Sequence, residues 1–558
     1  MLEEKEAIMA NFKEKVIYQL YPKSFNDSDG NGIGDIRGII EKLPYLETLG
    51  IDMIWMNPVF LSPQKDNGYD VTDYTAIDPV FGSMADLEEL IEKAKEKNIE
   101  LMFDMVFNHT STTHEWFQRA LAGEKEYEDY YIIRSPKEDG SLPTNWQSKF
   151  GGDAWDEFGE TGNYYLCLYD KTQADLNWRN PKVREELYKV VQFWLEKGIR
   201  GFRFDVLNVI GKAEELVDSD GDNEKGLYTD TPIVHDYVRE LNQASFGQYD
   251  DIITVGEMSS TTVENGVLYS NPDRNELSMI FSFHHLKVDY QDGEKWSDVP
   301  FDFIELKQLL DEWQSGMSDG NGWNALFWNN HDQPRANSRF GDPERFPYET
   351  TTMLAQAIHL LRGTPYIYQG EEIGMTNPDY GDINEYVDIE THNAYESMRL
   401  DGKSHQEAIA IIKQKSRDNS RTPMQWDSSL NAGFSTAEPW LKVADNYLDI
   451  NAEKELAEGS IFPYYQKLIQ LRKSMPIISD GSYQGILLDD PEVYAYIREK
   501  DGEKLLVLNH FYGTDYSLTI PEEWVQEGAE VVIGNYPDAS LTSQITLRPY
   551  ETVAFLIK

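Results

Sequence analysis

In this 558-residue chain, three short segments form the last residues of apolar runs. Each segment finishes with an acidic residue. Asp205 ends the segment 201–205, Glu257 ends 255–257 and Asp332 ends 330–332. Carboxyl groups can protonate a leaving oxygen, attack a sugar carbon and offset the positive charge that develops on a sugar ring. Together, the three residues are suited to the hydrolysis of a glycosidic bond.

The residues around these carboxylates suggest different roles for them. Arg203 precedes Asp205 by two positions and so shares one face of an extended strand with it. Its charge would keep Asp205 ionised and oriented, as a nucleophile requires; a purely structural ion pair is the alternative. Glu257 follows a glycine and an apolar strand, a setting that can raise a carboxyl pKa and suit a general acid. His109 and His331, at the ends of other apolar runs, could donate hydrogen bonds to sugar hydroxyls.

Eight short apolar runs of high β-propensity occur before residue 375. They cover residues 16–21, 53–58, 100–108, 199–206, 252–257, 277–283, 323–329 and 364–369. Most are almost continuously hydrophobic, as is typical of parallel strands buried on both faces. Helical patterns lie between several of them, and Pro181 suits the first position of one such helix. This alternation predicts a (β/α)₈ barrel, whose active site lies at the C-terminal strand ends, where the three carboxylates fall.

Two further segments differ from the barrel pattern. Residues 110–178 form a long Gly-, Trp- and Tyr-rich stretch after the third strand, which predicts an insertion domain. After about residue 480 the pattern changes to alternating strands, with a hairpin signal at Asp501-Gly502, which predicts a C-terminal antiparallel β-sandwich. We therefore expect a barrel of residues 1–109 and 179–479, an insertion domain of 110–178 and a C-terminal domain of 480–558.

Composition restricts the possible partners and compartment. The chain has 50 Lys and Arg against 98 Asp and Glu, a formal charge of −48, which argues against nucleic acids and anionic membranes as partners. Cys167 is the single cysteine, so no internal disulfide can form, in keeping with a reducing compartment. Residues 1–6 lack the basic and apolar blocks of a signal peptide, and no run approaches the roughly 20 apolar residues of a membrane span. We expect a cytoplasmic protein.

The loop after the first strand has the spacing of a cation site. Asp27, Asp29, Asn31, Ile33 and Asp35 alternate with other residues around a glycine turn, much as in the first half of an EF-hand loop. A solvated acidic turn is the alternative, and composition alone leaves the two readings even.

The quoted segments resemble a known family. Residues 104–109, 201–205, 255–257 and 330–332 resemble, in order, the four signature regions of the α-amylase superfamily (glycoside hydrolase family 13). Residues 173–177 resemble its additional insertion-domain motif, in the form found in oligo-1,6-glucosidases and their relatives. The resemblance spans essentially the whole chain. It implies a retaining α-glycosidase with Asp205 as nucleophile, Glu257 as acid/base and Asp332 as transition-state stabiliser.

The resemblance also implies a glucose pocket and a structural ion. The pocket for the non-reducing glucose would consist of Asp66, Tyr69, His109, Arg203, His331 and Arg421. A pocket of this kind is blocked at one end and makes an exo-acting enzyme that removes one glucose. The loop 27–35 binds Ca²⁺ or Mg²⁺ in similar family members, which favours a structural ion here; no cofactor is expected in catalysis.

Three segments, 255–263, 281–290 and 322–328, resemble the subgroup of the family that hydrolyses trehalose 6-phosphate, a phosphorylated disaccharide. A sugar phosphate carries a charge of about −1.5 to −2, so a chain of charge −48 would repel it. Screening over about 8 Å makes nearby charges decisive, and a local basic site is needed. We expect that site to comprise His284, His285, Lys287 and Lys295. The alternative is that the histidines pack or pair with Asp289 while Lys287 is solvated.

Other functions remain open at this point. Val206, directly after Asp205, resembles enzymes that cut α-1,6 bonds, which favours an oligo-1,6-glucosidase or dextran glucosidase acting on isomaltose-type sugars. A sucrose isomerase is disfavoured because residues 337–343 lack its arginine-rich loop. An inactive scaffold is disfavoured as well, since the chain keeps all three carboxylates.

Overall fold

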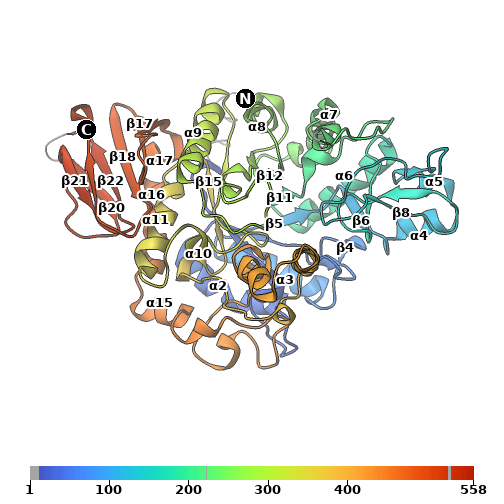
Figure 1. Ribbon diagram of the computed structural model, residues 1–558, viewed down its shortest axis with the longest axis horizontal. Helices are drawn as coiled ribbons and strands as arrows, with labels where there is room; N and C mark the ends of the chain where they lie inside the picture. The colour runs from blue at the N-terminus through green and yellow to red at the C-terminus, as the bar shows by residue number, and fades with distance from the viewer. Residues whose placement is uncertain (1–11, 222, 526–528) are drawn as a thin grey trace. The chain divides into compact units, whose positions relative to one another are not determined.

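The structure, a computed structural model, describes residues 12–221, 223–525 and 529–558 (Figure 1). The segment 1–6, from which no signal peptide is expected, lies outside the described residues. The chain divides into two compact units, Trp55–Phe283 and a second that combines Met1–Ile54 with His284–Lys558.

Eight strands form one sheet in the order β13-β12-β11-β5-β2-β1-β15-β14. Their bounds are β1 Ile17–Leu20, β2 Met53–Met56, β5 Glu100–Met105, β11 Gly201–Phe204, β12 Ile253–Glu257, β13 Met279–Phe281, β14 Ala325–Leu326 and β15 Thr364–Tyr368. Each lies within one of the eight predicted apolar runs, and the last strand pairs in parallel with the first. The predicted (β/α)₈ barrel is therefore confirmed.

Helices follow the strands as the alternating pattern predicts. In the unit 55–283 they are α3 Met84–Glu96, α4 Glu115–Leu121, α5 Lys125–Glu128, α6 Pro181–Lys197, α7 Pro232–Ala244 and α8 Val263–Ser270. In the other unit they are α2 Ile36–Leu49, α9 Phe303–Asp319, α10 Ala336–Phe340, α11 Pro347–His359, α12 Ile389–Leu400, α13 His405–Lys415, α14 Asp418–Arg421, α15 Ala452–Glu458, α16 Ile461–Ser474 and α17 Pro476–Asp480. Helix α6 begins with Pro181, as predicted, and ends at Gly198, whose φ of 102° is readily adopted by glycine.

The predicted insertion segment contains short strands. They are β6 His109–Ser111, β7 Ile133–Arg134, β8 Trp155–Glu157, β9 Tyr164–Leu166 and β10 Gln173–Asp175, arranged as a three-stranded sheet β7-β9-β8 and a pair β10-β6. Their apolar cluster contains Trp146, Trp155 and Leu168, and it also contains Val206, the residue after Asp205. A further pair, β3 Phe60–Leu61 with β4 Asp73–Ile77, lies earlier in the same unit.

The C-terminal strands form two antiparallel sheets that share one core. A five-stranded sheet has the order β16-β17-β18-β22-β20, and β19 pairs with β21. Their bounds are β16 Ser482–Ile486, β17 Val493–Lys500, β18 Glu503–His510, β19 Tyr516–Thr519, β20 Glu530–Gly534, β21 Gln544–Leu547 and β22 Thr552–Ile557. Leu518 and Leu547 from the pair pack in one cluster with Ile497 and Phe555 from the larger sheet. Asp501 and Gly502 both have positive φ, which fits the predicted hairpin.

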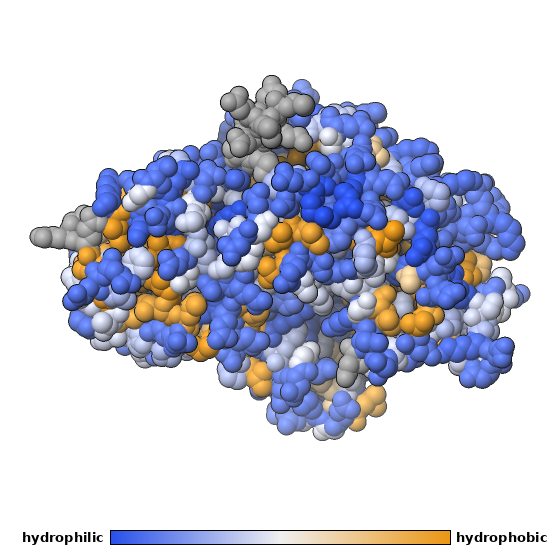
Figure 2. Space-filling model, turned by 90° about the horizontal axis from the view of Figure 1, so that it is seen from above, coloured by the Kyte–Doolittle hydropathy of each residue, from blue (hydrophilic) through white to orange (hydrophobic). Residues whose placement is uncertain are grey.

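The surface is consistent with the strongly acidic composition. Hydrophilic residues cover most of the face shown in Figure 2, and hydrophobic residues appear on it only in small groups. Among the described residues, no helix is long and apolar enough to span a membrane.

A buried arginine connects the C-terminal sheet to helices of the same unit. Arg498 on β17 is fully buried and donates hydrogen bonds to the backbone oxygens of Leu360, Ile478, Gly481 and Ser482 at 2.6–2.9 Å. These oxygens lie at or just beyond the ends of α11 and α17. One guanidinium group thus pairs with four carbonyl oxygens, and its bonds to Leu360, Ile478 and Gly481 are buried.

We predict that Arg498→Met lowers the free energy of unfolding by about 3 kcal/mol or more, because it leaves these carbonyl oxygens unpaired. Thermal unfolding followed by circular dichroism checks this. Arg399→Met, at an exposed arginine that bonds a single backbone oxygen, is the matched control. Equal melting temperatures of the two variants would contradict the prediction.

Candidate active site

One guanidinium group serves three carboxylates in the unit 55–283. Arg203 Nη1 lies 2.7 Å from Asp104 Oδ1 and 2.7 Å from Asp205 Oδ1, and Nη2 forms an ion pair with Glu257. Arg203 is buried, and Asp104 is completely so. Asp104 is absent from the residues expected from sequence, although a carboxylate inside an otherwise apolar strand is a signal that could have found it.

The shared cation does not offset the effect of burial on these groups. Burial raises the pKa of Asp205 well above its usual value; Arg203 acts in the opposite direction, and the charges of Glu257 and Asp104 raise it further. Burial likewise raises the pKa of Asp104 against the influence of Arg203. Arg203 thus favours the ionised form of Asp205, as expected, but burial and the two neighbouring carboxylates outweigh it, so the pKa of Asp205 is raised overall. Three buried carboxylates around one cation favour retention of a proton within the group.

Strand register brings Asp205 and Glu257 to adjacent positions. Strands β11 and β12 are parallel, with Phe204 opposite Gly256, so the next residue on each strand is one of the two carboxylates. A Cβ at Gly256 would lie 2.4 Å from Met258 Cε and 2.6 Å from Leu277 Cδ1, so a side chain there would require both of these side chains to move. Val206 has a φ of 36°, which is rare for a β-branched residue, so the backbone turns sharply directly after Asp205.

Four of the six residues expected to bind the glucose, Asp66, Tyr69, His109 and Arg203, lie in the unit 55–283, and His331 and Arg421 lie in the other unit. Tyr69 Oη donates to Asp104 Oδ2 at 2.8 Å, and His109 Nε2 lies 3.0 Å from the Tyr69 carbonyl oxygen. Gln173 bonds both Asp66 Oδ2 and the Tyr69 carbonyl oxygen at 3.0 Å. Burial lowers the pKa of His109 to about 4, so this histidine is a neutral hydrogen-bonding group. Gln173 lies in the segment 173–177 that resembles a family motif, but a contact between Gln173 and Asp66 was not predicted.

Asp332 is surrounded by cations and a histidine in the other unit. Arg421 Nη2 lies 2.7 Å from Asp332 Oδ1, and His331 Nε2 lies 3.2 Å from Oδ2. The side-chain nitrogen Nε2 of Gln19 lies 2.9 Å from His331 Nδ1. Because an amide nitrogen donates, Nδ1 accepts this hydrogen bond, and the proton of the neutral imidazole is on Nε2, which donates to Asp332. Arg421 Nε also bonds the His331 carbonyl oxygen at 2.7 Å.

A second arginine near Asp332 was not predicted. Arg417 Nη1 lies 3.5 Å from Asp332 Oδ1, and its Nη2 lies 2.6 Å from Asp388 Oδ1. Asp388 is 1% exposed and also lies 3.8 Å from Arg421. The neighbouring cations lower the pKa of Asp388 although burial acts in the opposite direction. Both arginines are thus held by one buried carboxylate, and Arg417 precedes Arg421 by four positions in the sequence.

The residues expected to bind phosphate follow β13. His285 Nε2 lies 2.9 Å from the Phe327 carbonyl oxygen, and burial lowers the His285 pKa to about 4, so it carries no charge at neutral pH. His284 stacks on Trp313 with ring centroids 5.7 Å apart. Lys287 is half-buried in the same segment. The expectation that His285 adds positive charge is therefore wrong, and the charge of such a site must come mainly from lysines.

Ion pairs near residues 284–287 affect the positive charge that is available to bind a phosphate. Lys295 Nζ forms an ion pair with Glu390 at 2.8 Å, so its charge is already balanced by a carboxylate. Asp289, the alternative partner proposed for the histidines, instead binds Arg339 at 2.6 Å and Lys415 at 2.7 Å. The histidines therefore do not owe their positions to an ion pair with Asp289.

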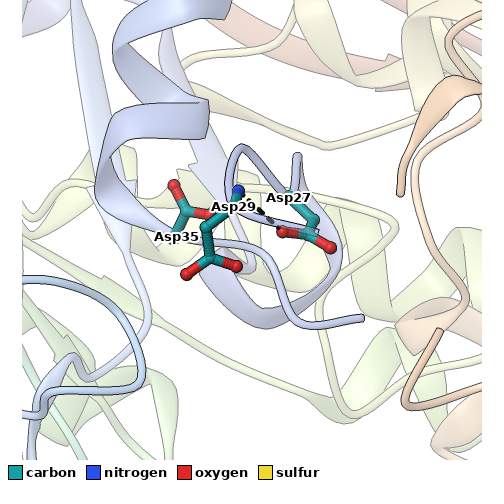
Figure 3. A group of neighbouring side chains, drawn as sticks. All are labelled: Asp27, Asp29 and Asp35. Atoms are coloured by element: carbon teal, nitrogen blue, oxygen red, sulfur yellow. Dashed lines mark hydrogen bonds between the residues drawn. The ribbon is translucent and has the colours of Figure 1, made fainter. Parts of the chain in front are cut away.

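The acidic loop after β1 gathers three carboxylates. Asp27, Asp29 and Asp35 lie beside one another (Figure 3), and one oxygen of each lies within 4.8 Å of the others. Burial and the adjacent negative charges raise the pKa of Asp29, and a bound cation would relieve this repulsion. Asn31 Oδ1 accepts a hydrogen bond from the Ile33 amide at 2.8 Å, which stabilises the turn between the carboxylates. The donor set of hard oxygens fits Ca²⁺ or Mg²⁺.

The chain matches the alpha amylase catalytic domain over residues 19–481 and the alpha-amylase SusG C-terminal domain over residues 493–554. It therefore belongs to the α-amylase family, glycoside hydrolase family 13, and is an enzyme of the glycoside hydrolase class.

Several characterised proteins are similar over almost their whole length. The chain is 51% identical to the trehalose-6-phosphate hydrolase of Bacillus subtilis (strain 168), with 98% of each chain covered. It is 46% identical to the oligo-1,6-glucosidase of Parageobacillus thermoglucosidasius, covering 98% of this chain and 99% of the other. The crystal structure of Bacillus licheniformis trehalose-6-phosphate hydrolase superposes with a TM-score of 0.94 at 52% identity, covering 98% of this chain and 99% of that one.

We predict that Asp205→Asn stabilises the protein at alkaline pH. The raised pKa in the folded state means that the ionised carboxylate costs stability above this pKa, a cost that vanishes as pH falls below the unfolded value of about 3.9. The variant should gain about 1 kcal/mol or more at pH 8 and little at pH 4, as measured by denaturant unfolding across this range.

The matched control is Asp139→Asn. Asp139 is exposed, and hydrogen bonds from Ser141 lower its pKa, so its replacement should not add stability at high pH. An Asp205→Asn protein no more stable than the unmodified protein at pH 8 would contradict the prediction.

Proposed function

We propose that this protein is a retaining, exo-acting α-glucosidase that hydrolyses trehalose 6-phosphate to glucose and glucose 6-phosphate. The observation that carries the proposal is the pair Asp205 and Glu257, which share Arg203 at the ends of neighbouring parallel strands in a member of the α-amylase family. The high identity to trehalose-6-phosphate hydrolases supports the choice of substrate.

In the first step of the proposed reaction, Glu257 transfers its proton to the oxygen that bridges the two glucose units. Asp205 attacks C1, the bond from C1 to this oxygen breaks, and glucose 6-phosphate leaves. The product on the enzyme is a glucosyl ester of Asp205. Asp332 stabilises the positive charge that develops on the ring in the transition state. Glu257 lies beside Asp205 on the neighbouring strand, which is the relation that an acid and a nucleophile need in this reaction.

In the second step, ionised Glu257 removes a proton from water, and the oxygen of this water attacks C1. The ester bond to Asp205 breaks, so the nucleophile is regenerated and glucose leaves with retained α configuration. Glu257 is protonated again and can start another cycle.

The unmodified glucose is proposed to bind Asp66, Tyr69, His109, Arg203, His331 and Arg421. Tyr69 and His109 are fixed by hydrogen bonds to Asp104 and to the backbone, so their orientation does not depend on the sugar. His331 is fixed in the same way by Gln19. Such preorganisation lowers the entropy cost of positioning C1. Binding of one terminal glucose in this way accounts for exo action.

The phosphate group is proposed to bind at the segment after β13, with Lys287 and Lys295 as its charged ligands. His284 and His285 contribute as neutral hydrogen-bonding and packing groups, since burial keeps His285 uncharged. Lys295 would exchange Glu390 for the phosphate as its partner or hold both. A doubly charged phosphate is a stronger acceptor than a single carboxylate.

An oligo-1,6-glucosidase is the alternative function. It is favoured by Val206 and by the 46% identity to enzymes of that name. The two functions share the same carboxylates and differ in the group that occupies the second sugar site.

Location and the structural ion belong to the proposal as well. A phosphorylated disaccharide does not cross membranes unaided, so we place the enzyme in the cytoplasm. The formal charge of −48 disfavours nucleic acids and anionic membranes as partners. Asp27, Asp29, Asn31, Asp35 and the backbone oxygen of Ile33 would hold Ca²⁺ or Mg²⁺, which stabilises the loop and takes no part in catalysis.

We predict that glucose is released from trehalose 6-phosphate with a higher kcat/KM than from trehalose or isomaltose. Lys287→Ala should lower kcat/KM for the phosphorylated substrate about tenfold or more, because a charge-assisted bond is lost, and should leave isomaltose cleavage nearly unchanged. Glucose release from the three sugars, assayed in parallel, checks both expectations.

Two outcomes would contradict the proposal. Fast isomaltose cleavage without a phosphate preference would favour the oligo-1,6-glucosidase. Unchanged turnover by Asp205→Asn would exclude Asp205 as the nucleophile, whichever substrate is used.

We predict that Ca²⁺ raises the melting temperature and that Asp29→Asn abolishes this effect. Saturation at about 100 times the dissociation constant would add about 2.7 kcal/mol of stability. Differential scanning calorimetry with Ca²⁺, with Mg²⁺ and with a chelator measures the shift, and Asp139→Asn, in another exposed loop, is the control. Equal shifts in both variants would contradict a site in the loop 27–35.

A further inference from the structure

The loop that carries Asp332 is closed at its base by one side chain. Asn329 precedes the loop, and its Oδ1 accepts a hydrogen bond from the backbone amide of Ala336, the residue after the loop, at 2.6 Å. Within the loop, Asn330 Oδ1 accepts from the Asp332 amide at 2.8 Å. The residues 330–335 thus form a short closed turn whose two ends are joined by the Asn329 amide group.

A buried carboxylate binds the nitrogen of the Asn329 side-chain amide. Asn329 Nδ2 donates to Glu371 Oε2 at 2.6 Å. Glu371, in the segment after β15, also accepts from Tyr465 Oη at 2.8 Å and from the Tyr368 amide at 3.4 Å. These partners are all donors, which matches a carboxylate because it only accepts hydrogen bonds. A carboxylate in this place therefore holds Asn329 in a single orientation.

Further hydrogen bonds hold the base of the loop. Arg335 and Ala336 are buried there and line a small cavity together with Asn329 and Glu371. Arg335 Nη1 donates to the Gln369 carbonyl oxygen at 2.6 Å, and the Arg335 backbone amide donates to Asn377 Oδ1 at 2.8 Å.

We propose that Asn329 and Glu371 are positioning residues for Asp332. They touch neither sugar nor reacting atoms; they act by holding the turn that presents the Asp332 carboxylate. This inference rests on the proposed role of Asp332 as transition-state stabiliser. A displacement of about 1 Å in such a group can reduce the rate about a hundredfold.

The test is a kinetic double-mutant cycle on an aryl α-glucoside, p-nitrophenyl α-D-glucopyranoside, which is independent of the phosphate preference. Asn329→Ala should lower kcat about 10- to 100-fold with little change in KM, since the interaction lost is made in the transition state. In an Asp332→Asn background the same change should lower kcat little further, because the residue being positioned has lost its charge.

Glu371→Gln tests the role of the second positioning residue, and Glu372→Gln is its matched control. Glu372 is also buried and adjacent in sequence, but it accepts hydrogen bonds from Tyr18 and Tyr45 at 2.7 Å and none from residues 330–335, with which it interacts only through the charge of Arg335. Both variants should be less stable than the unmodified protein, but only Glu371→Gln should have a lower kcat. The kcat values are measured well below both melting temperatures.

Three results would overturn the inference, and each has a distinct meaning. Unchanged kcat in Asn329→Ala, while Asp332→Asn is impaired, would refute the positioning role alone. Full additivity in the cycle, or an equal loss of kcat in Glu372→Gln, would indicate general destabilisation. Unimpaired Asp332→Asn would refute the proposed role of Asp332 and the positioning role with it.

Discussion

The shared ion pair of Arg203 with Asp104, Asp205 and Glu257 is the interaction on which the chemistry of this enzyme depends. Three carboxylates lie in a buried region with one cation, so full ionisation would leave a net charge of −2 out of contact with bulk water. Proton retention is the cheaper arrangement. Hydrolysis of a glycoside needs one carboxyl as an acid and another as a nucleophile, and a group that holds a proton between its members supplies this combination.

The environment of Asp332 has the opposite charge balance. Two guanidinium groups and an imidazole N–H face its carboxylate, which is one-third exposed. The buried Asp388 pairs with both arginines and offsets one of their two positive charges. Asp332 is therefore surrounded by donors that favour its ionised form, as stabilisation of a positive sugar ring requires. The two sets of carboxylates differ in charge balance because their roles differ.

The positions of the strands and of most site residues could be predicted from sequence because each depends on local pattern. Buried parallel strands produce apolar runs, and the carboxylates follow those runs directly. The sharing of Arg203 could not be predicted, because Asp104 lies 99 positions away and becomes its neighbour only through the register of β5 and β11. The neutral state of His285 was missed for a similar reason: its pKa depends on burial, which comes from tertiary packing.

The cations near the proposed phosphate site show why net charge is a poor guide to substrate. Lys295 pairs with Glu390, and Arg339 and Lys415 pair with Asp289. In this chain of charge −48, each of these three cations already has a carboxylate partner. A sugar phosphate must then compete with a carboxylate for a lysine, and its affinity is the difference between two ion pairs. This difference is sensitive to geometry over a few ångströms, whereas repulsion from the distant surface is screened over about 8 Å. In the proposed reaction, discrimination between a phosphorylated and an unphosphorylated disaccharide therefore depends on a few side chains after β13, while the carboxylates proposed to cleave the bond serve both substrates.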